Sequence, residues 1–422
     1  MKNVFLAFRE KSFLLLWVGE VFTQIAFNLF NFFIILHVYE LTKSNTAVSM
    51  AVLSFTIPAI LFGILAGVYV DWWNKKKVLL VTNILRALLL IILATFSQNI
   101  FLVYLTSFLI SVVTQFFIPA ETPMIPLVVR PQYLLSANAL FGLGLYGSIL
   151  VAYIISGPII LFLGAENILL FLAVLFLLGA LFISWIHFHP EEKNNKKNVF
   201  SESRKTIINE IKIAFSQIKN SRKISHAIFL LALAQILLLV LAVIAPGYAS
   251  QVVKIPIEQF PIYFIAPAAF GVFVGAVILV NYFSHFSKDK IMTGGLFLSG
   301  FAMFLLPYGS AFSSKQIVQS INVFLPRLFE VTTLHILILL AFILGLANSF
   351  VFVPSNTVLQ EETSDEFRGK LYGVLNAFVG VLSFLPIIVV GGLSDLIGVD
   401  KVIIGIGIIL LSIGASRILF EY

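Results

Sequence analysis

Of the twenty acidic residues, only one is predicted to lie well inside a membrane span, in the first long apolar segment, and polar residues follow it at helical spacing. Glu20 is followed by Gln24, Asn28 and Asn31, which fall about 40°, 80° and 20° from it around a helix. A carboxylate charge at the centre of a membrane costs roughly 2.5–3.5 kcal/mol, so Glu20 must face a cavity, a partner or a proton. This polar stripe predicts contacts with a bound small molecule, a coupling proton, or hydrogen bonds between helices.

The residues around this stripe favour an amphipathic ligand. Trp17 and Phe27 flank it and would give an aromatic-lined cavity with few polar contacts. Arg86, in another apolar segment, is expected to reach the membrane surface or to make a structural pair. Further polar residues within apolar segments are candidate cavity contacts, namely Gln115, Tyr146, Gln235, Asn348 and Asn376.

A second stretch marks the boundary between a membrane span and a short cytoplasmic turn. The stretch from Gly63 to Lys77 passes from small residues into an aspartate, two tryptophans and three lysines. Small residues allow close helix packing, tryptophan prefers the membrane interface, and lysine marks the cytoplasmic side. The simpler alternative for this stretch is a solvated turn that only fixes the topology. Elsewhere in the chain, Pro158 follows Gly157, and a proline inside a span can kink a helix where helices move, with a static kink as the simpler alternative. The small, charged and helix-breaking residues of these two regions are Gly63, Gly67, Asp71, Lys75, Lys76, Lys77, Gly157 and Pro158.

No catalytic motif accompanies these residues. The sequence has no phosphate-binding glycine loop, no H-E-x-x-H and no G-x-S-x-G. It has no cysteine, and His187 and His189 lack a carboxylate or thiolate partner for a metal site. We therefore expect no enzyme activity, no cofactor and no metal.

The composition is that of an integral membrane protein. The chain is 60% hydrophobic and 11% charged, and its mean hydropathy is +1.04. A water-soluble core cannot hide so much apolar surface, so lipid must be the solvent. The net charge of +7 is explained by lysine and arginine kept on the cytoplasmic face rather than by nucleic-acid binding.

Twelve apolar segments are long enough to cross a bilayer, which requires about 20 residues each. Continuous runs of this length predict an all-α bundle rather than a barrel. The predicted spans are 13–36, 47–70, 78–97, 101–120, 136–162, 167–188, 224–249, 261–284, 291–312, 333–355, 371–394 and 401–419.

The basic residues predict the orientation of these spans. With the N-terminus inside, 21 of the 27 lysines and arginines fall in cytoplasmic segments and five in outer loops, so both termini are predicted to be cytoplasmic. The longest polar break contains apolar residues at helical spacing from Ile207 to Ile218, which predicts an amphipathic helix. The predicted organisation is a six-helix half at 1–189, a linker at 190–223 and a second half at 224–422. A short helix is also predicted in the outer loop at 313–332.

A short internal echo supports two related halves. The sequence from Phe117 to Thr122 closes the fourth predicted span, and a similar sequence from Phe352 to Thr357 closes the tenth. Their equivalent positions predict an internal repeat. Since each half can supply the other's interface, no oligomer is required and a monomer is expected.

These residues together resemble the major facilitator superfamily, and most closely its branch of macrolide-efflux proteins and siderophore exporters. The likeness rests on the turn with Gly67, Asp71 and Lys75 to Lys77, although Trp72 and Asn74 depart from the usual pattern. Further matching segments are 39–42, 119–126, 136–140, 157–158 and 367–370.

The resemblance implies a secondary transporter in the cytoplasmic membrane that exports a small amphipathic compound by alternating access, with protons as a possible coupling ion. It also implies that Asp71 and its lysines act as a gate, with the aspartate facing the eleventh span. The predicted gate consists of these residues together with Gly63, Gly67, Gly157 and Pro158. Two alternatives remain, a carrier of lysophospholipids or other lipids, and a membrane scaffold or receptor without transport.

Overall fold

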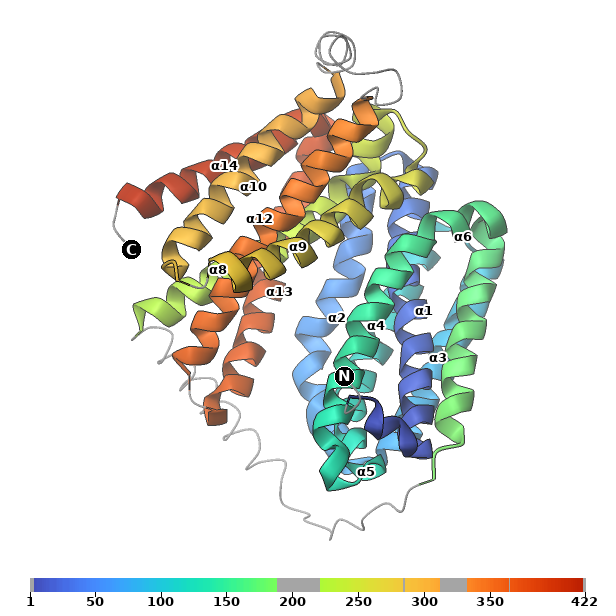
Figure 1. Cartoon of the computed structure of the whole chain (residues 1–422). Coiled ribbons are helices and arrows are strands. Elements are labelled where there is room, and N and C mark those ends of the chain that lie inside the picture. Colours follow the sequence, from blue (N-terminus) through green and yellow to red (C-terminus); the bar gives the residue numbers. More distant parts are fainter. Residues whose placement is uncertain (1–3, 188–220, 284, 312–331, 364, 420–422) are drawn as a thin grey trace, which may run out of the picture. The chain divides into compact units, whose positions relative to one another are not determined.

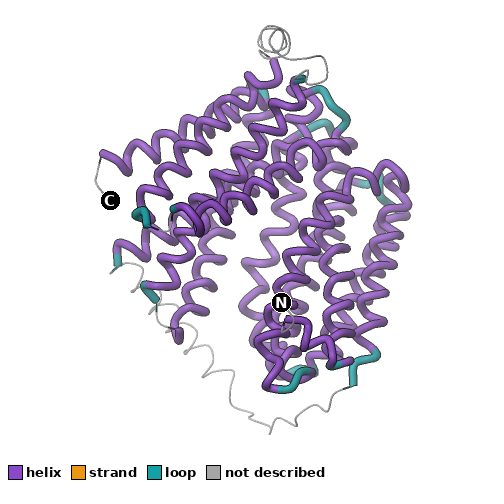
Figure 2. Tube along the Cα trace, viewed as in Figure 1, coloured by secondary structure: helices purple, strands orange, loops and turns teal. Residues whose placement is uncertain are grey.

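The computed structural model describes residues 4–187, 221–283, 285–311, 332–363 and 365–419. Every regular element in these ranges is a helix, as Figure 2 shows. Twelve helical stretches of the described ranges are long and apolar enough to cross a membrane. The prediction of an all-helical protein with twelve spans is therefore confirmed.

Contacts within the chain divide it into two compact units. The N-terminal unit comprises Met1–Lys43 and Ala47–Asn195, and the C-terminal unit comprises Ser44–Thr46 and Lys196–Tyr422. The amphipathic helix predicted in the linker and the short helix predicted at 313–332 lie outside the described residues. The predicted boundaries at 189 and 224 stay predictions.

The first half of the chain forms six α-helices, coloured blue to green in Figure 1. Short 3₁₀ helices cover Val4–Arg9, Thr122–Met124 and Pro131–Tyr133. The α-helices are α1 (Lys11–Thr42), α2 (Asn45–Trp72), α3 (Lys75–Thr95), α4 (Ile100–Glu121), α5 (Ile125–Val128) and α6 (Leu134–Ser184).

The second half also forms six described α-helices. Irregular helical segments join the first two of them, with π-helix at Tyr248–Val253 and Pro261–Ile265 and a 3₁₀ turn at Ile257–Gln259. The α-helices are α8 (Arg222–Gly247), α9 (Ala266–Tyr282), α10 (Lys288–Ala311), α12 (Thr333–Glu361), α13 (Asp365–Ile397) and α14 (Val399–Leu419).

Local side-chain chemistry explains where several helices start. Asn74 precedes α3 and its side chain accepts a hydrogen bond from the backbone N–H of Lys77 at 3.1 Å. Asn99 precedes α4 and accepts from the N–H groups of Phe101 and Leu102. These caps satisfy N–H groups that have no partner within the helix, which fixes each start against the preceding turn.

The helix α6 contains two predicted spans and doubles back on itself (Figure 1). Its backbone leaves the helical region at Gly164, where φ is +75°. This conformation favours glycine, so Gly164 explains the break between the spans predicted at 136–162 and 167–188. Pro158 lies inside the first arm of α6, where the backbone stays helical, so the kink expected at Gly157 and Pro158 stays a prediction.

The internal echo is only partly symmetric in the structure. The first segment ends α4 at Glu121, as expected. The second segment, from Phe352 to Thr357, lies inside α12, which continues to Glu361. Since a helix can continue beyond the membrane, its end at Glu361 does not test where the span ends, and the closing of the tenth span stays a prediction.

Two glycines bring α1 and α6 close together in the N-terminal unit. A Cβ atom on Gly179 of α6 would lie 3.1 Å from the carbonyl oxygen of Gly19, and a Cβ on Gly19 would lie 3.1 Å from that of Gly179. Small residues at such a crossing let two helix backbones approach inside a membrane. Glu20 follows Gly19 directly on α1 and is buried, where it interacts with Arg86 of α3 and Glu121 of α4.

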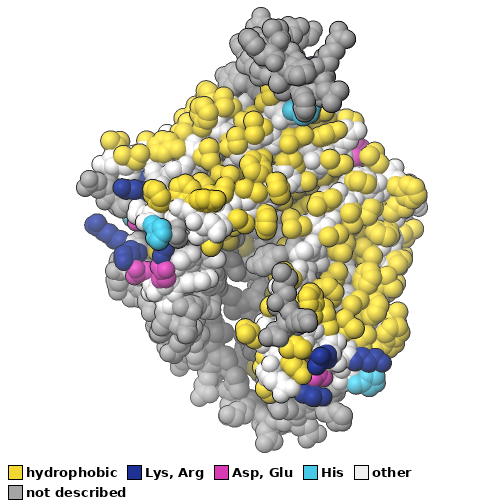
Figure 3. Space-filling view, in the orientation of Figure 1, with side chains coloured by type: hydrophobic (Ala, Val, Ile, Leu, Met, Phe, Trp, Pro, Cys, Tyr) yellow, Lys and Arg dark blue, Asp and Glu magenta, His cyan; other side chains and the backbone are white. Residues whose placement is uncertain are grey.

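The surface separates apolar sides from charged ends. On the face of the N-terminal unit visible in Figure 3, hydrophobic side chains cover the flank of the helices and the lysine and arginine side chains gather at one end. The C-terminal unit has ion pairs between Lys223 and Glu362 at 2.7 Å and between Arg417 and Asp289 at 3.2 Å. Both units thus present apolar flanks suited to lipid.

Candidate functional site

Three ionisable side chains from three helices are buried together in the N-terminal unit. Glu20 of α1 and Arg86 of α3 are each 1% exposed, and Glu121 at the end of α4 is 5% exposed. Buried charges are costly unless they are paired, so a group of three in one interior indicates a function or a strong structural requirement. We call these residues the buried ion cluster.

The two carboxyl groups of the cluster lie next to each other. Glu20 interacts with Glu121, with the amide of Gln24 and with the charge of Arg86, and Glu121 interacts with the same arginine. Both oxygens of Glu20 and Oε1 of Glu121 are buried without a hydrogen bond within the described residues. The carboxyl groups are therefore close but not locked into one hydrogen-bonded arrangement.

Arg86 makes one hydrogen bond and two ring contacts, while its Nε and its other terminal nitrogen have no hydrogen bond within the described residues. One terminal nitrogen donates to Oδ1 of Asn83 at 3.2 Å, and the Asn83 amide donates to Oγ1 of Thr23 at 3.0 Å. The guanidinium carbon lies 4.4 Å from the ring centre of Phe117 and 5.3 Å from that of Phe176. Rings at these distances attract a desolvated cation, so the positive charge has a fixed position.

Two sequence expectations about this region are corrected by the structure. Glu20 was expected to be the only acid well inside a span, but α4 continues through Pro119 to Glu121 and buries that carboxyl as well. Arg86 does not reach the membrane surface, because it is 1% exposed. Its interactions with both acids match the alternative expectation of a pair inside the protein.

The composition of the cluster determines what it can do chemically. With both acids ionised, the cluster has two negative charges and one positive charge. Two adjacent carboxyl groups can share one proton, because like charges at short range do not both ionise readily. A single bound proton therefore makes the cluster neutral, and its loss leaves one uncompensated negative charge.

The rest of the polar stripe extends from the cluster along α1. Gln24 is half-buried and adjoins Glu20, while the Asn28 amide donates to the Gln24 carbonyl at 2.8 Å. The buried Oδ1 of Asn31 has no hydrogen bond within the described residues. The structure thus places Gln24 against the cluster and leaves Asn31 with unused hydrogen-bonding capacity.

Trp17, one of the two aromatic residues expected beside the stripe, contacts α6. Trp17 donates its ring N–H to the carbonyl of Leu140 in α6 at 2.8 Å. Its ring also lies against Gly144, where an added Cβ would approach Nε1 to 2.6 Å. Trp17 therefore fastens α1 to the first arm of α6, a contact that sequence spacing did not reveal.

The other predicted cavity residues lie on helices of both units. Gln115 on α4 is half-buried and donates to the Ser111 carbonyl at 3.3 Å. In the C-terminal unit, Gln235 is half-buried, and Asn348 lines a cavity of about 10 Å³ with Ser299, which has room for about one water. The side chains of Tyr146 and Asn376 lie outside the described part of the protein.

Two of the predicted gate lysines are engaged in hydrogen bonds. Lys75 Nζ donates to the Val70 carbonyl at 2.6 Å. Lys76 Nζ donates to the carbonyls of Ser184 at 2.7 Å and Ile186 at 2.8 Å, which joins the start of α3 to the end of α6.

The remaining gate residues are less constrained. Lys77 is exposed. A Cβ added to Gly67 would have no atom within 4 Å, and a Cβ added to Gly63 would lie 3.6 Å from Oε1 of Gln115. Gly157 is buried and Pro158 is exposed, while the Asp71 side chain lies outside the described part, so its role in a gate stays a prediction. In the described part, no group of three or more histidine, aspartate or glutamate side chains is placed to hold a metal ion.

The chain is similar in sequence to known membrane transporters. The sequence profile of the Major Facilitator Superfamily matches residues 16–386. The chain is 22% identical over 411 residues to the MFS-type transporter YfmI of Bacillus subtilis (strain 168), covering 95% of this chain and 94% of YfmI. It is 24% identical over 307 residues to YvqJ of the same organism, covering 72% of this chain and 66% of YvqJ.

Solved structures agree at the level of the fold. The nucleoside transporter NupG has a TM-score of 0.68 at 14% identity, covering 97% of this chain and 99% of NupG. A bacterial homologue of the human lysosomal transporter Spinster, in an inward-facing and occupied conformation, has a TM-score of 0.70 at 13% identity and covers 96% of each chain. Identities this low show a shared fold and carry no information about the substrate.

Proposed function

The chain belongs to the Major Facilitator Superfamily, and from this premise we propose that it is a proton-coupled secondary transporter that exports a small amphipathic compound by alternating access. The coarser statement, a membrane transporter rather than an enzyme, follows from the family match and the transporter fold. The coupling ion, the direction and the class of substrate are the proposal. The buried ion cluster is the observation that carries it.

The excess of one carboxyl over the available cation supports proton coupling. Glu20 and Glu121 lie beside one arginine in an interior that is at most 5% exposed. An uncompensated charge in such an interior is costly, so the cluster favours the state in which the acids hold one proton. A change of solvent access that hydrates the carboxyl groups removes this cost and allows the proton to leave.

Because Arg86 keeps its charge, we expect only the two carboxyl groups to gain or lose the proton. Arg86 is enclosed by Asn83 and two phenylalanine rings, so its charge stays in place while the carboxyl groups gain or lose a proton. The buried oxygens of Glu20 and Glu121 that have no hydrogen bond within the described residues are free to hold this proton. A bound proton and a cationic substrate group would both neutralise the same site and would therefore compete.

The polar stripe supports a substrate with few polar groups. Gln24 adjoins the cluster, and Asn31 has a buried oxygen without a hydrogen bond in the described part of the chain. A mostly apolar site with a few convergent polar atoms is typical of small-molecule pockets. Drug-like, macrolide-like and siderophore-like compounds are therefore the first candidates, and a monomer is sufficient.

The test has two steps. The purified protein is first screened by ligand-dependent thermal stabilisation against drugs, macrolides, siderophores and lysophospholipids, because a ligand that binds the folded state raises the melting temperature. Each stabilising compound is then measured in proteoliposomes with and without an imposed pH gradient. We expect accumulation of an amphipathic compound driven by the gradient and abolished by a protonophore.

Three outcomes contradict the proposal. Transport that ignores the pH gradient excludes proton coupling at the cluster. A melting shift confined to lysophospholipids and dependent on their headgroup favours a lipid carrier. The absence of transport for every compound that stabilises the protein favours a scaffold or receptor.

A further inference from the structure

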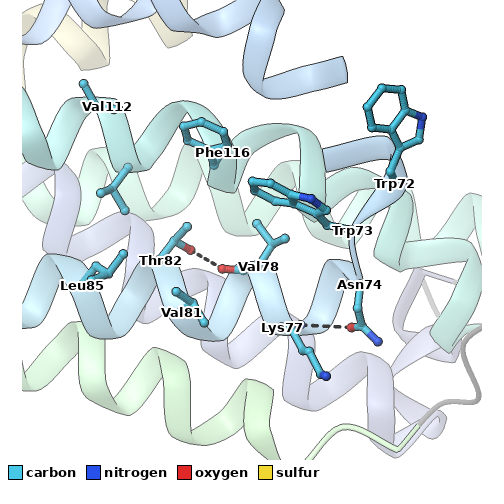
Figure 4. Close-up of a pocket in the computed structure, with 11 residues that line it drawn as sticks. Trp72, Trp73, Asn74, Lys77, Val78, Val81, Thr82, Leu85, Val112 and Phe116 are labelled. Atoms are coloured by element: carbon cyan, nitrogen blue, oxygen red, sulfur yellow. Dashed lines mark hydrogen bonds between the residues drawn. The ribbon is translucent and has the colours of Figure 1, made fainter. Parts of the chain in front are cut away.

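A large groove lies on the flank of the N-terminal unit, and Glu20, Arg86 and Glu121 are not among the residues that line it. It has a volume of about 640 Å³ and is lined by residues of α3 and α4 and of the turn between α2 and α3. Figure 4 shows α3 and α4 forming its two walls. The volume falls within the roughly 300–1,000 Å³ typical of small-molecule sites.

The floor and walls of the groove are apolar. Val81 and Leu85 line it from α3, and Val112 and Phe116 line it from α4. The hydroxyl of Thr82, which also lines it, donates to the Val78 carbonyl of its own helix at 2.7 Å. The deep part of the groove therefore offers an occupant apolar contact and no unused hydrogen-bonding group from Thr82.

One end of the groove is polar and aromatic. Lys77 and Asn74 lie at the end where α3 begins, together with Trp72 and Trp73 (Figure 4). The Trp73 ring stacks on Phe116 with centres 5.9 Å apart, which closes this end of the apolar channel. Tryptophan and lysine at the end of an apolar channel are typical of the boundary between hydrocarbon and headgroups.

The Lys77 ammonium is the available charge at this end. The neighbouring lysines use their ammonium groups on backbone carbonyls, Lys75 on that of Val70 and Lys76 on those of Ser184 and Ile186. For Lys77, only the backbone N–H makes a hydrogen bond among the described contacts, and its side chain is exposed. The three adjacent positive charges favour an anionic partner and repel a headgroup that has its own ammonium.

The length of the groove matches one lipid chain. Lys77 and Leu85 are eight residues apart on α3, which is about 12 Å along a helix. Half of a typical hydrocarbon core is about 15 Å. A molecule with its headgroup at Lys77 therefore extends its chain from the interface almost to the middle of the bilayer.

We propose that this groove is a binding site for one anionic phospholipid, with its phosphate at Lys77 and one acyl chain between α3 and α4. The headgroup lies at the turn that contains the predicted gate, on the side that the charge distribution predicts to be cytoplasmic. The lipid occupies the outer flank of the unit and is distinct from the transported compound. The proposal does not depend on what the protein exports.

Native mass spectrometry of the full chain in detergent provides the test. The protein is titrated with phosphatidylglycerol and with phosphatidylcholine that have the same acyl chains. We expect the first phosphatidylglycerol to bind at least about tenfold more tightly than the first phosphatidylcholine. Equal binding of the two lipids overturns the assignment of an anionic headgroup.

Matched variants locate the site. Val81→Trp fills the groove and Leu88→Trp is its control, because these residues are 53% and 50% exposed and lie seven positions apart on the same face of α3. Lys77→Gln removes the charge, and Lys11→Gln, an exposed lysine on α1, is its control. We expect Val81→Trp to weaken phosphatidylglycerol binding about tenfold and Lys77→Gln to abolish the headgroup preference, with both controls unchanged.

A fluorescence measurement on the native groove removes any dependence on a space-filling variant. Phosphatidylglycerol with brominated chains should quench tryptophan emission more than brominated phosphatidylcholine at the same mole fraction. The double variant Trp72→Phe/Trp73→Phe should lose that difference, because the two rings line the groove. Undiminished phosphatidylglycerol binding by Val81→Trp, or a quenching difference that survives in the double variant, contradicts the proposed location.

Discussion

The guanidinium carbon of Arg86 lies 4.4 Å from the ring centre of Phe117, and this contact explains how α4 organises the buried ion cluster. Phe117 and Glu121 are four residues apart on α4, so they face the same side of the helix. The ring attracts the cation and the carboxyl one turn later adds a negative charge near it. One face of α4 therefore positions Arg86 through Phe117 and supplies Glu121 as the second acid of the cluster.

Replacing one acid of the pair should uncouple transport from protons. In Glu121→Gln, Glu20 and Arg86 form a neutral pair without a bound proton, so the variant should fold, bind substrate and exchange it across the membrane. Accumulation of substrate against its gradient under an imposed pH difference should be lost. Proteoliposome uptake and exchange assays measure the two activities separately.

The control for this prediction is Glu10→Gln, which removes an acid that pairs with Arg130 at 3.1 Å outside the cluster and should keep the coupling. Glu20→Gln should behave as Glu121→Gln does if the two carboxyl groups share one proton. Full pH-driven accumulation by either cluster variant would falsify the shared site.

Removing the cation of the cluster should destabilise the fold. Arg86→Met leaves two buried acids without their countercharge, and breaking a buried pair in this way costs about 3–5 kcal/mol. We expect a large drop in melting temperature, partly recovered in the double variant Arg86→Met/Glu20→Gln. Thermal unfolding in detergent gives the comparison, and a single variant as stable as the wild type excludes a structural role for the charge.

The apolar pattern predicted the helices well because a span must be long and continuous in order to satisfy its backbone within hydrocarbon. The predicted fourth span at 101–120 and α4 at Ile100–Glu121 differ by one residue at each end. The same pattern also left a break between the spans predicted at 136–162 and 167–188, where Gly164 lies, but it could not identify the one residue at which the backbone leaves the helical region.

The site was predicted from one residue and completed by the structure. Glu20 was identified because an acid within an apolar run is conspicuous. Glu121 was missed because it follows Pro119 at the end of such a run, where a loop is the usual interpretation. Two signals in the sequence pointed to Glu121, namely its four-residue spacing from Phe117 and the need of Arg86, inside an apolar segment, for an acidic partner. Sequence alone, however, does not bring α1, α3 and α4 together.

A methyl group at the crossing of α1 and α6 should disturb the support of Arg86. In Gly179→Ala, the new Cβ would lie 2.6 Å from Thr23 Oγ1 and 3.2 Å from the Asn83 amide, and overpacking of this kind costs about 1–3 kcal/mol. The control is Gly142→Ala in the same helix, where nothing lies within 4 Å. Thermal unfolding should separate the two variants, and equal melting temperatures would contradict the close packing.

The predicted gate at Asp71 is testable without a described side-chain position. Asp71→Asn removes a charge close to the start of α3, where a charged residue at a helix terminus contributes about 0.3–1 kcal/mol. We expect normal membrane insertion and a transport rate reduced about two- to fivefold. Surface expression and uptake are measured on the same cells, and normal transport by correctly inserted protein excludes the gate.

Lys76 should matter more than Lys77 for the stability of the N-terminal unit, although the two are adjacent in the sequence. Lys76 Nζ donates to the carbonyls of Ser184 and Ile186, so Lys76→Met leaves the end of α6 without two hydrogen bonds and should cost about 1 kcal/mol. Lys77→Met loses no described side-chain hydrogen bond and should change the melting temperature little in lipid-free detergent. If the two variants melt at the same temperature, α6 is not fastened to α3 by Lys76, and the lysine run acts only through its total charge.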